Sequence, residues 1–292
     1  MRGIEALGFG TSARQSRHES FVAFAHYRYL GWAVLAAGAS VVLYIVDRPY
    51  GTRYGGTWAG YILGVAGAVL IGWLTWFGYR KRSYADVKGR LAARLSAHVY
   101  FGLALLVIVT LHTGFHFGRN VHTLAYVLMC LAILSGMFGV FSYLRYPRLM
   151  TENRAGMTMQ QMLGTIATLD EQLRVAAMPL DETTAMVVAS AVETSAIGGS
   201  LWRRLTQRYP RCTTAAALAH LDGIAGSVPA AEEEAWSQVR VLLDDKASLL
   251  TRVRRDLGYK AMLECWLSLH VPVSFMLLAA LVAHIVSVFF LW

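Results

Sequence analysis

The two stretches LSAHVYFGLALLVIVTLHTGFHF (residues 95–117) and LSLHVPVSFMLLAALVAHIVSVFFL (residues 267–291) decide the expected fold, because each is long and apolar enough to cross a bilayer. Each also carries two histidines fourteen positions apart: His98 and His112 in the first, His270 and His284 in the second. Fourteen residues of α-helix come within about 40° of four whole turns and rise roughly 21 Å. Each helix therefore presents both imidazoles on one stripe, with one ring near each side of the membrane.

The composition is that of a membrane protein with a long polar section. Of the 292 residues, 56% are hydrophobic and 15% are charged. Five apolar stretches predict membrane-spanning helices, and they cover residues 29–46, 57–79, 95–117, 122–144 and 267–291. Residues 1–25 contain no continuous apolar segment of the kind found in a secretory signal, so we expect the first stretch to be a retained anchor.

Charge indicates the orientation in the membrane. Residues 1–145 contain 14 Lys+Arg against 4 Asp+Glu, whereas residues 146–292 contain 13 against 14. The basic run from Arg80 to Arg94 lies between the second and third stretches and is typical of a cytoplasmic loop. It has no folded basic domain around it, which argues against a nucleic-acid partner. We expect a multi-pass protein of the inner (cytoplasmic) membrane, with residues 1–28 and 146–265 cytoplasmic and the C-terminus outside.

This topology predicts which histidines face each other. The third and fifth spans run in the same direction, so His98 should face His270 near the cytoplasm and His112 should face His284 near the outer surface. Ionisable groups inside hydrocarbon are costly and mark function by default. A neutral imidazole that coordinates iron exchanges its lost hydration for a metal bond. We therefore expect two b-type haems, each with two histidine ligands. The alternative is a non-redox scaffold or transporter whose histidines pack or relay protons.

Other polar residues near the histidine stripe are weaker candidates. His116 lies eighteen residues after His98 and returns to the same angular position on a helix, which makes it a substitute ligand or a partner for a haem propionate. Residues expected at the outer surface, to neutralise propionates, bind a quinone or simply anchor the interface, are Arg119, His122 and Arg53. Their expected counterparts on the inner side are Arg90, Arg94, Tyr259 and Lys260.

The spacing of His98 with His112 and of His270 with His284 resembles the two-haem, four-histidine core of membrane b-type cytochromes. That core occurs in the cytochrome b subunit of quinol-oxidising complexes and in the ferric-reductase and NADPH-oxidase transmembrane family, and placing the pairs on the third and fifth spans is similar to the latter. The resemblance covers the spans but not residues 146–265. It implies that the four histidines are axial ligands.

The same resemblance implies a role in electron transfer. We expect a respiratory-chain subunit that carries electrons between a quinone or soluble redox partner and another redox protein, such as a cytochrome c or an iron–sulfur protein. The chain departs from the oxidase pattern because it ends at Trp292, without a sixth span or a flavin or nicotinamide domain. A subunit of an oxidoreductase complex is thus expected rather than a self-contained enzyme, and a homo-oligomer stays open.

Residues 146–265 are expected to form a helical cytoplasmic domain, which makes the fold an all-α five-helix membrane bundle with a helical insertion between spans 4 and 5. Apolar spacing predicts a helix over Met157–Met178 and a shorter helix over 181–193 that starts at Asp181. Residues 194–212 are expected to form a break with a solvated basic face. The domain is interpreted as a docking platform for a partner, with a small-molecule sensor as the alternative.

The end of the domain predicts one further long helix. Pro229 should open it, and it could continue into the last span with interruptions near Gly258 and at Pro272. The three cysteines are far apart and form no CxxC motif, which predicts small buried thiols rather than disulfides or a metal cluster. They are Cys130, Cys212 and Cys265.

Overall fold

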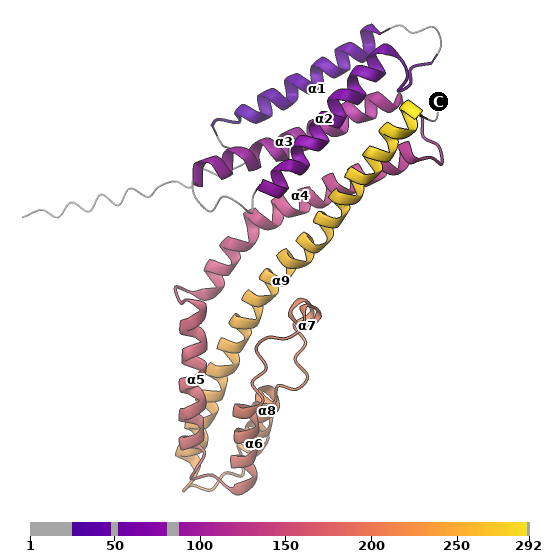
Figure 1. The fold of residues 1–292 in the computed structure, drawn as a ribbon. Coiled ribbons are helices and arrows are strands. Elements are labelled where there is room, and N and C mark those ends of the chain that lie inside the picture. The colour runs from indigo at the N-terminus through magenta and orange to yellow at the C-terminus, as the bar shows by residue number, and fades with distance from the viewer. Residues whose placement is uncertain (1–24, 48–51, 81–87, 291–292) are drawn as a thin grey trace, which may run out of the picture. The chain divides into compact units, whose positions relative to one another are not determined.

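Every element in the described part of the chain is an α-helix. The computed structural model (Figure 1) describes residues 25–47, 52–80 and 88–290. Predictions that concern residues 1–24 or the basic residues at 81–87 fall outside the described residues. The helices are α1 (Arg28–Val46), α2 (Trp58–Arg80), α3 (Lys88–Thr113), α4 (Val121–Arg154), α5 (Met159–Ala176), α6 (Glu182–Glu193), α7 (Leu201–Thr206), α8 (Thr214–Ile224) and α9 (Glu233–Phe290). The all-α class is confirmed for these residues.

Five of the described helices contain a segment long and apolar enough to cross a membrane, as predicted. These helices are α1, α2, α3, α4 and α9. Their outward surfaces are apolar: on α1, Val34, Leu35 and Ile45 are each at least 60% exposed. Large contiguous apolar surface is unusual on a soluble monomer and suits contact with lipid.

The third predicted span ends earlier than expected. The helix α3 stops at Thr113 because Gly114 and Phe115 have φ values of +56° and +63°, in the left-handed region where a right-handed helix cannot continue. A Cβ on Gly114 would collide with the carbonyl oxygen of Arg53, so the close approach of these two loops also requires glycine. Residues 114–117 were predicted to be helical, and that prediction is wrong.

The chain divides into two compact units, and the dividing points fall inside α4 and α9. The first unit contains residues 1–129 and 278–292. Here α3 packs against both α1 and α2. The contact with α1 buries Tyr100 and Ala104 against Ala33. Toward α2, a Cβ on Gly67 would lie 2.9 Å from Val109 Cγ2, so glycine allows the two helices to approach closely.

In the second unit, residues 130–277, α4 and α9 run antiparallel. The rings of Tyr146 and Tyr259 stack at 5.4 Å, and Asn153 donates a 2.7 Å hydrogen bond to the Arg252 carbonyl oxygen. Moving toward the C-terminus of α4 thus moves toward the N-terminus of α9. The predicted domain boundaries at residues 145 and 265 lie inside these continuous helices.

The last helix differs from its prediction at three points. It begins at Glu233 and not at Pro229, which lies in a turn where Glu232 N donates to the Pro229 carbonyl at 2.9 Å. It then continues for 58 residues without a break at Gly258 or Pro272. Gly258 is covered by the loop after α7, since a Cβ there would lie 2.6 Å from Gln207 Nε2. Close packing at this glycine outweighs its weak helix propensity.

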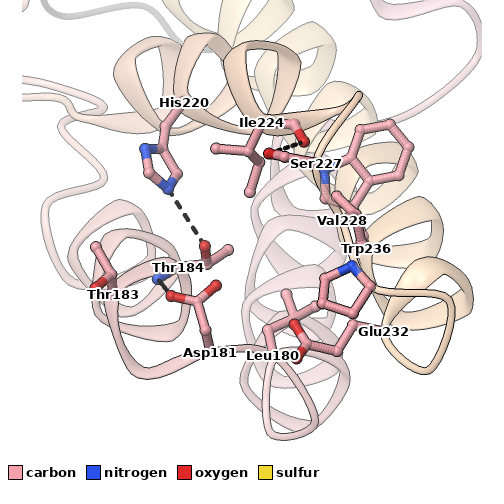
Figure 2. Close-up of a pocket in the computed structure, with 11 residues that line it drawn as sticks. Leu180, Asp181, Thr183, Thr184, His220, Ile224, Ser227, Val228, Glu232 and Trp236 are labelled. Atoms are coloured by element: carbon pink, nitrogen blue, oxygen red, sulfur yellow. Dashed lines mark hydrogen bonds between the residues drawn. The ribbon is translucent and has the colours of Figure 1, made fainter.

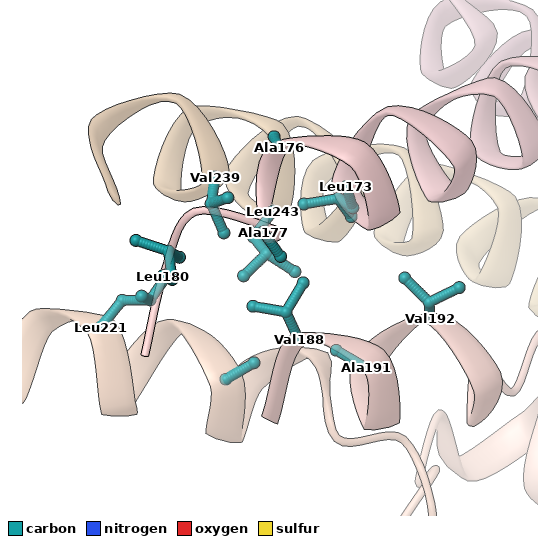
Figure 3. Close-up of a cluster of buried hydrophobic side chains, with 11 residues drawn as sticks. Leu173, Ala176, Ala177, Leu180, Val188, Ala191, Val192, Leu221, Val239 and Leu243 are labelled. Carbon is teal, nitrogen blue, oxygen red and sulfur yellow. The ribbon is translucent and has the colours of Figure 1, made fainter. Parts of the chain in front are cut away.

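The remaining helices of the second unit form a small core with the first part of α9 (Figure 3). Leu173 of α5, Val188 of α6, Leu221 of α8 and Leu243 of α9 are at most 1% exposed. The predicted helices at 157–178 and 181–193 correspond to α5 and α6, and Asp181 caps α6 by accepting a 3.1 Å hydrogen bond from Thr184 N. The short helix α7, inside the predicted break at 194–212, and α8 were not predicted.

Candidate functional site

His112 is held near the end of α3 by the start of α2. Its Nδ1 lies 2.7 Å from the carbonyl oxygen of Gly60. Because a carbonyl oxygen only accepts, Nδ1 must carry the hydrogen, which leaves Nε2 as the lone-pair nitrogen of the neutral ring. The ring lies against glycines: a Cβ would be 2.7 Å from His112 Cε1 at Gly64 and 3.1 Å from it at Gly55. The sequence of α2 thus makes a slot for this imidazole.

The structure brings His284 of α9 to His112 of α3. Their ring centroids are 6.0 Å apart and the ring planes make an angle of 84°. The predicted side-by-side placement of these two histidines is therefore present within the first unit. His284 also contacts His122 at the start of α4, where the two ring centroids are 4.5 Å apart and the two Nδ1 atoms form a hydrogen bond.

His122 is a member of this cluster that the sequence argument placed only at the outer surface. His122 joins the cluster because it is the second residue of α4 and follows the turn from α3. Its ring therefore lies at the same end of the helices as His112. A histidine directly after a short interhelical turn is the signal that would have found it.

The second unit holds His270 in a comparable way. Its Nδ1 lies 2.8 Å from Ser135 Oγ on α4, and that hydroxyl donates to the Ala132 carbonyl oxygen at 2.9 Å. The Ser135 oxygen must therefore accept from His270, so Nδ1 again carries the hydrogen and Nε2 the lone pair. Trp266, one turn earlier on α9, stacks on the His270 ring at 5.5 Å and donates from Nε1 to the Ser135 carbonyl oxygen at 2.7 Å.

Two glycines of α4 make room for these rings. A Cβ on Gly136 would lie 3.6 Å from His270 Cε1, which is ordinary contact, whereas a Cβ on Gly139 would overlap the indole of Trp266.

His98 and Arg94 lie half-buried on α3, one turn apart. His98 belongs to the first unit and His270 to the second, so the pairing of His98 with His270 stays a prediction. Among the described residues, no group of three or more His, Cys, Asp or Glu side chains is arranged to hold a metal ion.

Two of the outer-surface candidates are exposed residues of the turn between α3 and α4. His116 bonds through Nδ1 to the Gly114 carbonyl oxygen at 2.8 Å, and because α3 has already ended, the helical periodicity that put it on the ligand stripe is wrong. Arg119 is exposed in the same turn. Arg53 instead lies over the ring of Tyr44 at 5.0 Å and donates from Nε to the Asp47 carbonyl oxygen at 3.1 Å.

Three histidines have Nδ1 engaged in a hydrogen bond: His112, His270 and His284. A metal-binding histidine usually has its other ring nitrogen hydrogen-bonded, which fixes the tautomer and the ring orientation. His112 and His270 donate from Nδ1 in this way, and Nδ1 of His284 is bonded to Nδ1 of His122. In none of the three does Nε2 form a hydrogen bond within the described residues. Two imidazoles that bound one metal from opposite sides at about 2.0 Å would have ring centroids roughly 6 Å apart. The ring centroids of His112 and His284 are 6.0 Å apart.

A cavity of about 250 Å³ lies at the far end of the second unit, between α6, α8 and the start of α9 (Figure 2). Asp181 lines it, and hydrogen bonds from the Thr184 side chain and backbone hold the pKa of this carboxyl below its usual range. The His220 Nε2 lies 3.3 Å from Thr184 Oγ1 on the opposite wall. The cavity is smaller than most pockets that enclose a drug-sized ligand. If the domain is a small-molecule sensor, this cavity would accommodate only a small polar molecule.

The cysteines differ from their predicted burial at one position. Cys130 and Cys212 are half-buried, but Cys265 is exposed on α9, so the prediction of a buried thiol is wrong there. Burial raises the pKa of the Cys212 thiol, but hydrogen bonds from Thr214 and Arg254 outweigh it and lower the pKa to about 7. The lowered pKa favours the thiolate form of Cys212, which is the reactive form of a thiol.

No protein-family model, curated protein or solved structure matches this chain.

Proposed function

We propose that the protein is a di-haem b-type cytochrome: a membrane electron-transfer subunit that carries electrons across the bilayer between a quinone or soluble redox partner and another redox protein. The outer haem is held by His112 and His284, and the inner haem by His98 and His270. The four-histidine arrangement that resembles known membrane b-type cytochromes motivates this proposal.

The observation that carries the proposal is the shared state of the described ligands. His112, His270 and His284 each have Nδ1 engaged, by a backbone carbonyl, a serine hydroxyl and a second histidine respectively. In His112 and His270 this leaves Nε2 as the available lone-pair nitrogen, and in His284 it does so when His284 donates to His122. A buried histidine that served only to pack helices would be expected to bond Nε2 as well, and within the described residues these three form no hydrogen bond there.

The residues of the chain would orient and insulate the haems. The Gly60 carbonyl and the Ser135 hydroxyl hold two of the rings, and hydrogen bonds of this kind also raise the basicity of a ligand. Ser96 and Tyr100, on either side of His98, are buried, which excludes water from this part of α3. A haem with two histidine ligands supplies one-electron transfer when bound and has no position open for oxygen.

The spacing of the ligands favours transfer across the membrane. His98 and His112 lie fourteen residues apart on one continuous helix, so their levels differ by about 21 Å along α3. His270 and His284 have the same separation on α9. Two haems held at these levels would divide the thickness of a hydrocarbon core of about 30 Å into shorter steps.

A second candidate function is supported by the contact between His122 and His284. Two hydrogen-bonded imidazoles can pass a proton, and a transporter or scaffold could use the cluster with His112 for that purpose without any haem. The two functions differ in their cofactor, so one measurement separates them.

The deciding experiment is a reduced-minus-oxidised absorbance spectrum of the purified full-length chain, with a pyridine assay of its haem content. We expect the sharp bands of low-spin b-type haem and two haems per chain. The variants His112→Ala and His284→Ala should lose the same haem, and His98→Ala and His270→Ala the other. His116→Ala is the matched control, because this exposed histidine lies in the turn and should leave both haems in place.

A purified chain without haem would refute the proposal and leave the proton-relay function. One haem per chain would show that one histidine pair is structural. Loss of different haems from His98→Ala and His270→Ala would refute the parallel pairing of the third and fifth spans.

A further inference from the structure

The short helix α7 is held beside the point where α4 leaves its apolar segment. The last apolar residue of that segment is Leu144, and Tyr146, two residues later, stacks on Tyr259 of α9 at 5.4 Å. A Cβ on Gly258, the neighbour of Tyr259, would lie 3.2 Å from the carbonyl oxygen of Arg204 in α7. The backbone of α7 thus contacts α9 beside Tyr259, whose ring packs on a residue two positions beyond the end of the apolar segment of α4.

The side chain of Arg204 ties α7 to the start of the apolar segment of α9 as well. Its Nη1 and Nη2 donate to the two carboxylate oxygens of Glu264 at 3.2 and 2.8 Å. Glu264 precedes Leu267, the first residue of the long apolar run, by three residues, or about 4.5 Å of helix. Figure 1 shows α7 beside α9, between α8 and this apolar run. Both apolar helices of the unit thus place α7 at the same level.

Several side chains of α7 and of the loop after it are exposed, whereas Leu205 and Tyr209 are half-buried. Trp202 is 73% exposed, the highest exposure of any described tryptophan. Three arginines in the segment are also exposed, and none of them forms an ion pair with a described carboxylate: Arg203, Arg208 and Arg211. The exposed indole of Trp202 leaves apolar surface in water, whereas the exposed arginines are well hydrated. Both kinds of side chain suit the headgroup layer of a bilayer, where tryptophan is enriched and arginine meets lipid phosphate.

We propose that residues 201–211 form a membrane-surface anchor, in which Trp202 inserts among lipid headgroups and Arg203 and Arg208 bind anionic lipid. The anchor would fix the height of the helical domain above the bilayer, because Arg204 and Gln207 bond it to α9. This inference requires that α4 and α9 span the membrane, but it does not depend on haem. The anchor could therefore be refuted while the proposed electron transfer holds, and the electron transfer could be refuted while the anchor holds.

The test uses hydrogen exchange of the full-length chain in nanodiscs of neutral phosphatidylcholine, or of the same lipid with one third phosphatidylglycerol. Amides of residues 201–211 should exchange more slowly in the anionic discs, by roughly fivefold for each arginine that binds lipid. The variant Arg203→Gln with Arg208→Gln should lose this difference between the two lipids. Trp202→Ala should exchange faster in both kinds of disc.

The matched control neutralises two arginines far from the bilayer, Arg174→Gln with Arg240→Gln. Arg240 precedes Glu264 by 24 residues, or about 36 Å of helix, which is several times the Debye length of about 8 Å. This variant should keep the lipid-dependent protection. Exchange in residues 233–250 reports whether each variant is folded.

Equal exchange rates in the two kinds of disc would overturn the proposal, and so would a lipid-dependent difference that survives Arg203→Gln with Arg208→Gln. Soluble glycerol phosphate, added to neutral discs, should give no protection. Protection by that compound would show a phosphate site in place of a bilayer anchor and would also overturn the proposal.

Discussion

Replacing Gly64 by alanine should displace the ring of His112 and weaken the outer site. A Cβ at this position would lie 2.7 Å from His112 Cε1 and 2.9 Å from Nδ1. Ordinary contacts begin near 3.4 Å, so the ring has to move by about 0.7 Å. The hydrogen bond from Nδ1 to the Gly60 carbonyl, now 2.7 Å, would lengthen toward its limit.

Two terms lower the stability of the Gly64→Ala protein, and one term raises it. Overpacking of a tight contact costs about 1–3 kcal/mol, and loss of the hydrogen bond costs about 1 kcal/mol more. The gain in helix propensity from glycine to alanine, about 1 kcal/mol, acts in the opposite direction. Gly72→Ala on the same helix isolates that gain, because nothing lies within 4 Å of its added Cβ. Relative to Gly72→Ala, the Gly64→Ala protein should be less stable by about 2–4 kcal/mol.

Two assays measure this prediction. Thermal unfolding of the two variants in the same detergent should differ by about 5–10 °C in Tm. If the proposed haem is present, its affinity at the outer site should fall by about tenfold to a hundredfold in Gly64→Ala, as for other changes to the partners of a ligand. Equal Tm values and equal haem content in the two variants would refute the slot that α2 forms around His112.

Three further predictions concern the second unit. Replacing Ser135 by alanine removes the hydrogen-bond partner of His270 Nδ1 and should lower haem affinity at the inner site by about tenfold. Haem content measured during dilution tests this, and unchanged haem retention would contradict the assigned tautomer of His270. With the other two cysteines changed to serine, the rate of Cys212 alkylation should rise with pH through an apparent pKa of about 7, because the thiolate is the reactive form; a midpoint near 9 would contradict it. Arg154 donates two hydrogen bonds, of 3.0 and 2.7 Å, to the two carboxylate oxygens of Asp256. Replacing Asp256 by asparagine removes the negative charge and one of these acceptors, and should lower the free energy of unfolding by about 2–3 kcal/mol, since Asp256 is fully buried but Arg154 is partly exposed. Replacing both residues by leucine should recover most of that loss.

Helix ends and helix continuity show where local sequence signals are insufficient. The end of α3 at Thr113 depends on Gly114, whose positive φ allows a close approach to the loop that contains Arg53. The spacing of apolar residues along the sequence does not reveal that contact. Conversely, Gly258 and Pro272 are local helix breakers, yet α9 passes through both. At Gly258, packing of the α7 loop offsets the weak helix propensity of glycine. At Pro272, a proline is tolerated because neighbouring groups in an apolar helix can satisfy the backbone carbonyl that it leaves without a partner.

For the histidines too, some features could be predicted from the sequence and others could not. The positions of His112 and His284 on helical stripes could be predicted because helical periodicity relates residues of one segment. The roles of Gly60, Ser135 and His122 could not, since each lies on a different helix from the ring it contacts, and no local pattern links residues so far apart in the chain.

The sequence by itself determined the all-helical class, the five apolar helices and the repeated fourteen-residue spacing of the histidines, because these follow from hydrophobicity and helical period within single segments. Only the tertiary structure decided that the Nδ1 atoms of His112, His270 and His284 are all engaged, and that α7 lies level with the ends of two apolar segments. Hydrogen-bond direction and relative height are properties of packed helix pairs, and packing is settled by the shapes of side chains that meet only when the chain has folded.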